Sequence, residues 1–113
     1  MTDDSYPDIP YEFGAGWNDL VNDTLDRLFA VDPDLEILQV KEKFGTLRLY
    51  YHTEFDHGTP QAMLIGTTVR DAEMRSERIC EQCGLPGQLF SQNRRIFASC
   101  TKHAGDAIVV EDE

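Results

Sequence analysis

A chain of 113 residues, with 41% hydrophobic and 27% charged residues, has the length and composition of one soluble globular domain. Its formal net charge of −11 disfavours direct contact with nucleic acid and favours a partner with a basic surface, although excess acid also serves solubility. It has no apolar run of about 18 residues, no signal peptide and too few cysteines for a disulfide framework, so we expect a cytoplasmic protein without a membrane span.

The first 40 residues carry most of the negative charge. They hold ten acidic residues against the single base Arg27. Residues 1–15 contain prolines and acids without an apolar period and are predicted to form an acidic N-terminal arm. Residues 17–30 repeat apolar side chains at intervals of three and four, which predicts an amphipathic helix. Its acidic face, Asp19, Asp23 and Asp26, is the candidate partner-binding surface.

A β-hairpin is predicted next. Leu38, Val40 and Phe44 alternate with polar side chains. In the next segment Leu47, Leu49 and Tyr51 alternate with Arg48, Tyr50 and His52. We therefore expect strands over 35–44 and 47–52, a turn near residues 44–46, and the three residues Leu38, Val40 and Phe44 on the apolar face. A long second helix follows, with Thr59 as N-cap and Pro60 at its first position, and it is expected to run to Ile79.

The cysteines carry the strongest chemical signal. Cys80 and Cys83, followed sixteen residues later by Cys100 and His103, form a C-x2-C…C-x2-H pattern. This spacing is typical of two short turns that hold one tetrahedral zinc ion, with a β-hairpin in the intervening loop. Strands are expected over 88–91 and 95–99. The sequence thus predicts an α+β fold ending in a zinc-ribbon-like or treble-clef-like module over 80–103, and one structural zinc as cofactor.

Four protein ligands close the coordination shell of zinc, whereas a catalytic zinc keeps one position open for water. The loop residues His52, Glu54, Asp56 and His57 are a weaker candidate for a second metal or acid–base site. No other nucleophile or phosphate-binding motif is visible, so we expect a protein that is not an enzyme and has no catalytic residues.

The segment QVKEKFGTLRLYYH, from Gln39 to His52, together with CEQCG and CTKH, resembles a small, largely uncharacterised zinc-binding family of bacteria and phages. The resemblance covers about residues 16–104, and Thr46 stands where the family has a second glycine. It implies a zinc-bound α+β domain over 16–104 and no particular activity. The residues that follow, 105–113, end in three acidic residues and are predicted to form an acidic tail. In size and acidity the chain is also similar to zinc-binding anti-CRISPR proteins.

These features favour a non-enzymatic, zinc-stabilised acidic protein of a phage or mobile element. It is expected to act as an inhibitor that docks on a basic surface of a nucleic-acid-handling protein, such as an RNA-guided CRISPR nuclease. Two alternatives remain open. One is an immunity protein against a basic nuclease toxin. The other is a zinc-bearing nucleic-acid adaptor that uses basic residues near the zinc module, including Arg75, Arg78, Arg94 and Arg95.

Overall fold

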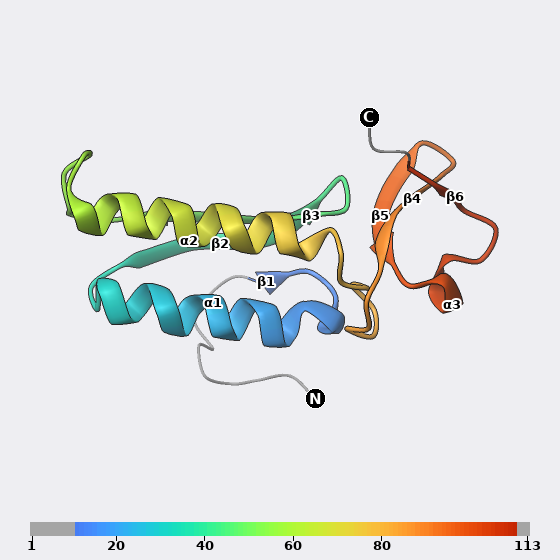
Figure 1. Ribbon diagram of the computed structural model, residues 1–113, viewed down its shortest axis with the longest axis horizontal. Coiled ribbons are helices and arrows are strands. Elements are labelled where there is room, and N and C mark those ends of the chain that lie inside the picture. Colours follow the sequence, from blue (N-terminus) through green and yellow to red (C-terminus); the bar gives the residue numbers. More distant parts are fainter. Residues whose placement is uncertain (1–10, 111–113) are drawn as a thin grey trace.

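The computed structural model describes residues 11–110 and confirms an α+β fold, drawn in Figure 1. The elements in chain order are β1 (Tyr11–Glu12), the 3-10 helix η1 (Ala15–Trp17), α1 (Asn18–Val31), β2 (Glu36–Lys43), β3 (Thr46–His52), α2 (Pro60–Ser76), β4 (Gln88–Gln92), β5 (Arg95–Ser99), α3 (Thr101–Ala104) and β6 (Ile108–Val109). They form two parts, which we call the helical body (residues 11–76) and the metal module (residues 80–110).

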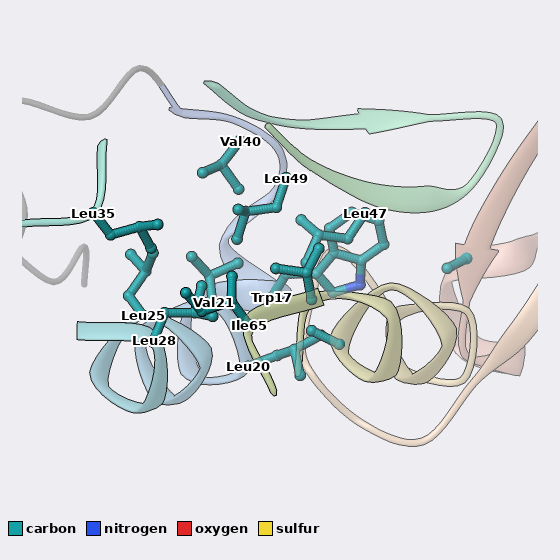
Figure 2. Close-up of a cluster of buried hydrophobic side chains, with 13 residues drawn as sticks. Trp17, Leu20, Val21, Leu25, Leu28, Leu35, Val40, Leu47, Leu49 and Ile65 are labelled. Atoms are coloured by element: carbon teal, nitrogen blue, oxygen red, sulfur yellow. The ribbon is translucent and has the colours of Figure 1, made fainter. Parts of the chain in front are cut away.

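The helical body is a two-layer structure. Its sheet has the order β1-β2-β3, with β1 parallel to β2 and β2 antiparallel to β3. Helices α1 and α2 supply the second layer. The side chains between the layers form the core, as Figure 2 shows. Four of the fully buried side chains, Trp17, Leu25, Leu28 and Ile65, come from the η1–α1 segment and from α2.

Helix α1 has the amphipathic pattern that the sequence predicts. Its buried residues are Leu20, Val21, Thr24, Leu25 and Leu28. Thr24 can be buried in this apolar stripe because its hydroxyl donates a hydrogen bond of 2.7 Å to the Leu20 carbonyl oxygen, one turn earlier. The helix ends at Val31, before Pro33.

The hairpin forms as predicted, but two of the three residues expected on its apolar face lie elsewhere. Val40 is fully buried, whereas Leu38 is 49% exposed and Phe44 is 64% exposed. Leu38 falls at a shift of register between Ile37 and Gln39, which breaks the alternation of the strand. Phe44 and Gly45 form the two-residue turn, with φ of 56° and 81°, so the Phe44 side chain leaves the sheet.

Helix α2 starts as predicted, because the Thr59 hydroxyl accepts a hydrogen bond from the Ala62 N–H and Pro60 occupies the first turn. It ends at Ser76, earlier than expected, and Ile79 instead pairs with Pro86 in an isolated bridge. Near its end, α2 covers the free edge of β3. The Ser76 hydroxyl accepts a hydrogen bond of 2.8 Å from the Leu47 N–H, and the Glu73 carboxylate accepts one of 3.2 Å from the Leu49 N–H.

The metal module lies at one end of the molecule, beyond the end of α2 (Figure 1). Its sheet has the order β5-β4-β6, all antiparallel, and the strand positions predicted around residues 88–91 and 95–99 are confirmed. Each end of the described part of the chain joins a sheet. Tyr11–Glu12 pair with β2, and Ile108–Val109 pair with β4. Residues 1–10 and 111–113 lie outside the described residues.

Within residues 11–110, neither long helix has the length and apolarity needed to cross a membrane.

Candidate metal centre

The four predicted ligand residues converge at the junction between the helical body and the metal module. Their ligand atoms, three cysteine sulfurs and one histidine ring nitrogen, all lie within 4.8 Å of one another. Cys80 and Cys100 are buried, His103 is half-buried and Cys83 is exposed. The four residues predicted from the sequence spacing are therefore close enough together to hold one metal ion.

The first ligand pair is held by a tight turn after α2. The Cys80 N–H donates a hydrogen bond of 2.8 Å to the Leu85 carbonyl oxygen, and the Gly84 N–H donates one of 2.9 Å to the Cys80 carbonyl oxygen. Gly84 adopts φ of 83°, a conformation that glycine tolerates well, so the chain can reverse directly after Cys83. Both sulfurs consequently face the same point.

The second pair lies at the start of the short helix α3, immediately after β5. Cys100 is the N-cap residue, and the His103 N–H donates a hydrogen bond of 3.2 Å to its carbonyl oxygen. This single turn places the two side chains on one side of the backbone. The strands β4 and β5 between the two pairs carry the second pair back toward the first.

Three of the six distances between ligand atoms are close to those around a tetrahedral ion. The Cys83 and Cys100 sulfurs are 3.7 Å apart, and the His103 Nδ1 lies 3.3 Å from the Cys100 sulfur and 3.6 Å from the Cys80 sulfur. Zinc bonds of about 2.3 Å to sulfur and about 2.0–2.1 Å to nitrogen give tetrahedral edges of about 3.8 Å and 3.5 Å. The site is thus shaped for one four-coordinate ion.

The electrostatics of the site favour a cation. Burial raises the pKa of the Cys80 thiol. Hydrogen bonds from the backbone N–H groups of Cys100, Cys83 and Gln82, together with the His103 side chain, outweigh this and lower the pKa from 9.0 to about 6. For Cys83, a hydrogen bond from the Leu85 backbone lowers the pKa, yet desolvation and the two nearby sulfurs raise it overall. Thiolates crowded in this way repel one another unless a cation neutralises them.

Sequence reasoning missed how the helical body holds the first ligand turn. The Gly16 N–H donates a hydrogen bond of 2.7 Å to the Glu81 carbonyl oxygen, and the Trp17 ring N–H donates one of 2.9 Å to the Ile79 carbonyl oxygen. A Cβ on Gly16 would lie 2.6 Å from the Glu81 carbonyl carbon, so only glycine fits this approach. The pair of glycines before Trp17 was the available signal.

Glu81 completes this contact. Its carboxylate accepts a hydrogen bond of 2.8 Å from the Gly14 N–H, and its backbone N–H donates one of 3.1 Å to the Ala98 carbonyl oxygen. Burial raises the pKa of this carboxyl group. The ligand turn is therefore tied to η1 on one side and to β5 on the other.

The other predicted site residues lie away from the metal centre. Asp19, Asp23 and Asp26 are exposed on α1, where Asp23 forms an ion pair of 3.0 Å with Arg27. His52, predicted to lie in a loop, is the last residue of β3, and it forms an exposed pair at 3.0 Å with Glu54 in the loop that follows. Among the residues that the structure describes, the cysteine and histidine cluster is the one group of three or more such side chains that can hold a metal.

No protein-family model, curated protein or solved structure matches this chain. The resemblance to a bacterial and phage family, carried by the hairpin and ligand motifs, stays a prediction.

Proposed function

We propose that this protein is a non-enzymatic binding protein whose fold is held together by one zinc ion bound to Cys80, Cys83, Cys100 and His103. The observation that carries the proposal is the closed set of four ligands with near-tetrahedral separations. Three thiolates and one imidazole favour zinc over hard cations such as magnesium or calcium. With four protein ligands the ion has no open position for a substrate, so its role is structural.

The ion would act where the two parts of the molecule meet. Cys80 lies between two residues that contact the helical body. The Ile79 carbonyl oxygen accepts a hydrogen bond from the Trp17 ring, and Glu81 accepts hydrogen bonds from the Gly14 and Gly16 N–H groups. A metal that fixes Cys80 therefore also fixes the surface against which η1 packs. Zinc would stabilise the module and keep α1 in position at the same time.

The candidate partner surface is the acidic side of α1. Asp19, Asp23 and Asp26 lie on the side of the helix opposite the buried stripe that includes Leu20 and Leu25. Such a face attracts a basic protein surface and accelerates encounter with it. We propose that the partner is a nucleic-acid-handling protein, of which an RNA-guided CRISPR nuclease with its basic channel is one example, and that binding inhibits it.

Metal analysis tests the first part of the proposal. Purified protein is expected to contain one equivalent of zinc per chain, and the zinc should be removed only by strong chelators or acid, because protons compete for the thiolates and the imidazole. Folded protein with far less than one equivalent of any metal would contradict the structural role.

Charge reversal tests the second part. Replacing Asp19, Asp23 and Asp26 by lysine changes the formal charge from −11 to −5 without touching the apolar stripe. We expect slower association with a candidate basic nuclease and weaker inhibition at low salt. A variant with the same charge change at the exposed residues Asp34, Glu36 and Asp56 is the control. Equal inhibition by the α1 variant and the wild type would show that this face is not the binding surface.

A further inference from the structure

The face of the β1–β2–β3 sheet that is turned away from the helices has a composition unlike the rest of the molecule. Val40 and Leu49, which are paired, point into the core, so alternation places their neighbours on the outer face. Lys41 and Arg48 are directly paired there, and Lys43 follows on the same side. Three of the chain's ten basic residues therefore share one small surface.

Two exposed aromatic rings accompany these bases. Tyr50, on the outer face of β3, is 43% exposed, and the Lys41 ammonium lies 6.0 Å from its ring centroid. Phe44, at the hairpin turn, is 64% exposed, and the Lys43 ammonium lies 5.8 Å from its ring centroid. Each ring is thus a flat apolar surface beside a cation.

The position of Phe44 is fixed by its surroundings. A φ of 56° is unfavourable for a bulky side chain, and residues held in this region persist only where neighbouring structure imposes it. Here the Gly45 N–H donates a hydrogen bond of 2.8 Å to the Glu42 carboxylate. A Cβ on Gly45 would lie 3.1 Å from the Phe97 Cα, so the turn abuts the metal module. The turn is therefore held by contacts on both sides while its phenylalanine faces solvent.

The bases Lys41, Lys43 and Arg48 gather at the hairpin end of the outer sheet face, which also carries the acids Glu12 and Glu36. The acids of α1 point away from the core on the helical side, whereas Lys41, Lys43 and Arg48 point away from it on the sheet side. Glu12 lies beside Lys41 on this face, and its carboxylate accepts a hydrogen bond of 3.0 Å from the Gln39 amide. The net charge of −11, which disfavours nucleic acid for the chain as a whole, does not describe this face.

We propose that the surface formed by Lys41, Lys43, Phe44, Arg48 and Tyr50 binds single-stranded nucleic acid, with the three bases contacting phosphates and the two rings stacking on nucleobases. Stacking rings combined with a basic groove or sheet are the means by which proteins hold single strands. A duplex keeps its bases paired and stacked on one another, so it cannot use the rings. An acidic peptide would use the cations but would gain little from Phe44 and Tyr50.

The proposal extends the proposed function and needs no protein partner for its test. Fluorescence anisotropy with a labelled oligo-dT strand of about 20 nucleotides measures binding to the zinc-loaded full chain. Three phosphate contacts predict that the logarithm of the binding constant falls with the logarithm of salt concentration with a slope of roughly −2. Single-stranded DNA should bind more tightly than the matching duplex.

Two kinds of variant separate charge from stacking. Lys43→Ala and Arg48→Ala should each make the salt slope shallower by about 0.7, because each removes one phosphate contact. Tyr50→Ala should weaken binding by about 5- to 100-fold at an unchanged slope, and Tyr50→Phe should restore it. The double variant Arg70→Ala with Arg78→Ala, both exposed and outside this sheet, is the control for loss of positive charge.

Several results would overturn the proposal. These are no binding at about 50 mM salt, equal affinity for duplex and single strand, and a loss of binding in the Arg70 and Arg78 control that equals the loss in the sheet variants. Displacement of the strand by polyglutamate, with no effect of Tyr50→Ala, would instead identify an acidic protein as the partner. Because the α1 charge reversal leaves the sheet face intact, it should not weaken oligonucleotide binding, which keeps this test separate from that of the proposed function.

Discussion

The helical body and the metal module are stabilised by different means. Among the described residues, the buried apolar cluster has thirteen members, and the module contributes only Ala98 to it. The module has a few buried residues of its own, including Phe90 and Ala104, and a metal held by the four predicted ligands would supply the rest of its stability. A short segment can thus hold a defined shape without a large core if a metal replaces the missing apolar contacts.

Removing one ligand should cause the largest loss of stability, and the loss should come from the metal module. Cys83→Ser is the cleanest change because Cys83 is exposed, so the substitution leaves no cavity. It should remove several of the roughly 10–16 kcal/mol that a structural zinc site contributes, and with them most of the bound zinc. Calorimetry and metal analysis measure both effects. The neighbouring exposed residue gives the control, since Gln82→Ser should change neither. Equal stability of the two variants would contradict a structural metal.

A core substitution should affect the body and leave the module loaded. Ile65 is fully buried, so Ile65→Ala should lower the free energy of unfolding by about 2–5 kcal/mol. Met63, on the same helix, is 63% exposed, and Met63→Ala should have a small effect. Denaturant titration gives the stability, and the zinc content at low temperature should stay at one equivalent. Loss of zinc in Ile65→Ala without unfolding would show that the two parts are more tightly coupled than the packing indicates.

The contact between the two parts can be weakened without changing a core or ligand side chain. Gly16→Ala places a methyl group against the backbone of Cys80 and Glu81 and should cost about 1–3 kcal/mol. Because the same backbone carries the Cys80 ligand, zinc should also be released faster to a competing chelator. Unchanged stability and unchanged zinc release would remove the basis for coupling through η1.

The smallest expected effect is a gain in stability. A Cβ on Gly66, inside α2, would meet only the Tyr51 hydroxyl, at 3.8 Å, which is an ordinary contact. Gly66→Ala should therefore stabilise the body by about 0.5–1 kcal/mol, since alanine loses less backbone entropy in a helix. It serves as the matched control for Gly16→Ala, with the same chemical change and the opposite sign. Destabilisation by Gly66→Ala would mean that α2 packs more tightly at this point than the structure shows.

The sequence predicted the parts of this fold that depend on local patterns. The apolar repeat of α1, the Thr59 cap of α2 and the clustering of Cys80, Cys83, Cys100 and His103 all follow from short spacings. The misplacement of Leu38 arose because one shift of register moves a side chain out of an alternating pattern. Phe44 was misplaced because the hydrophobicity of its side chain gives no sign of a positive φ.

The contact between η1 and the ligand turn could not be predicted in this way. The Trp17 and Ile79 partners are 62 residues apart, and their pairing depends on how two separate elements come together. Gly14 and Gly16 indicate a close approach of backbone, but not which backbone approaches. The separation of the α1 acids from the bases of the outer sheet face could not be predicted for the same reason, since the net charge does not say where charged residues lie in the fold.

The side chains of α2 that cover the edge of β3 have a consequence for association between copies of this protein. An open strand edge offers N–H groups to any other strand and invites sheet extension or fibril growth. Here Ser76 and Glu73 already occupy the N–H groups of Leu47 and Leu49. Because these acceptors come from a helix, the β3 edge opens at these two residues when α2 leaves the sheet, so sheet extension at this edge should follow unfolding of α2.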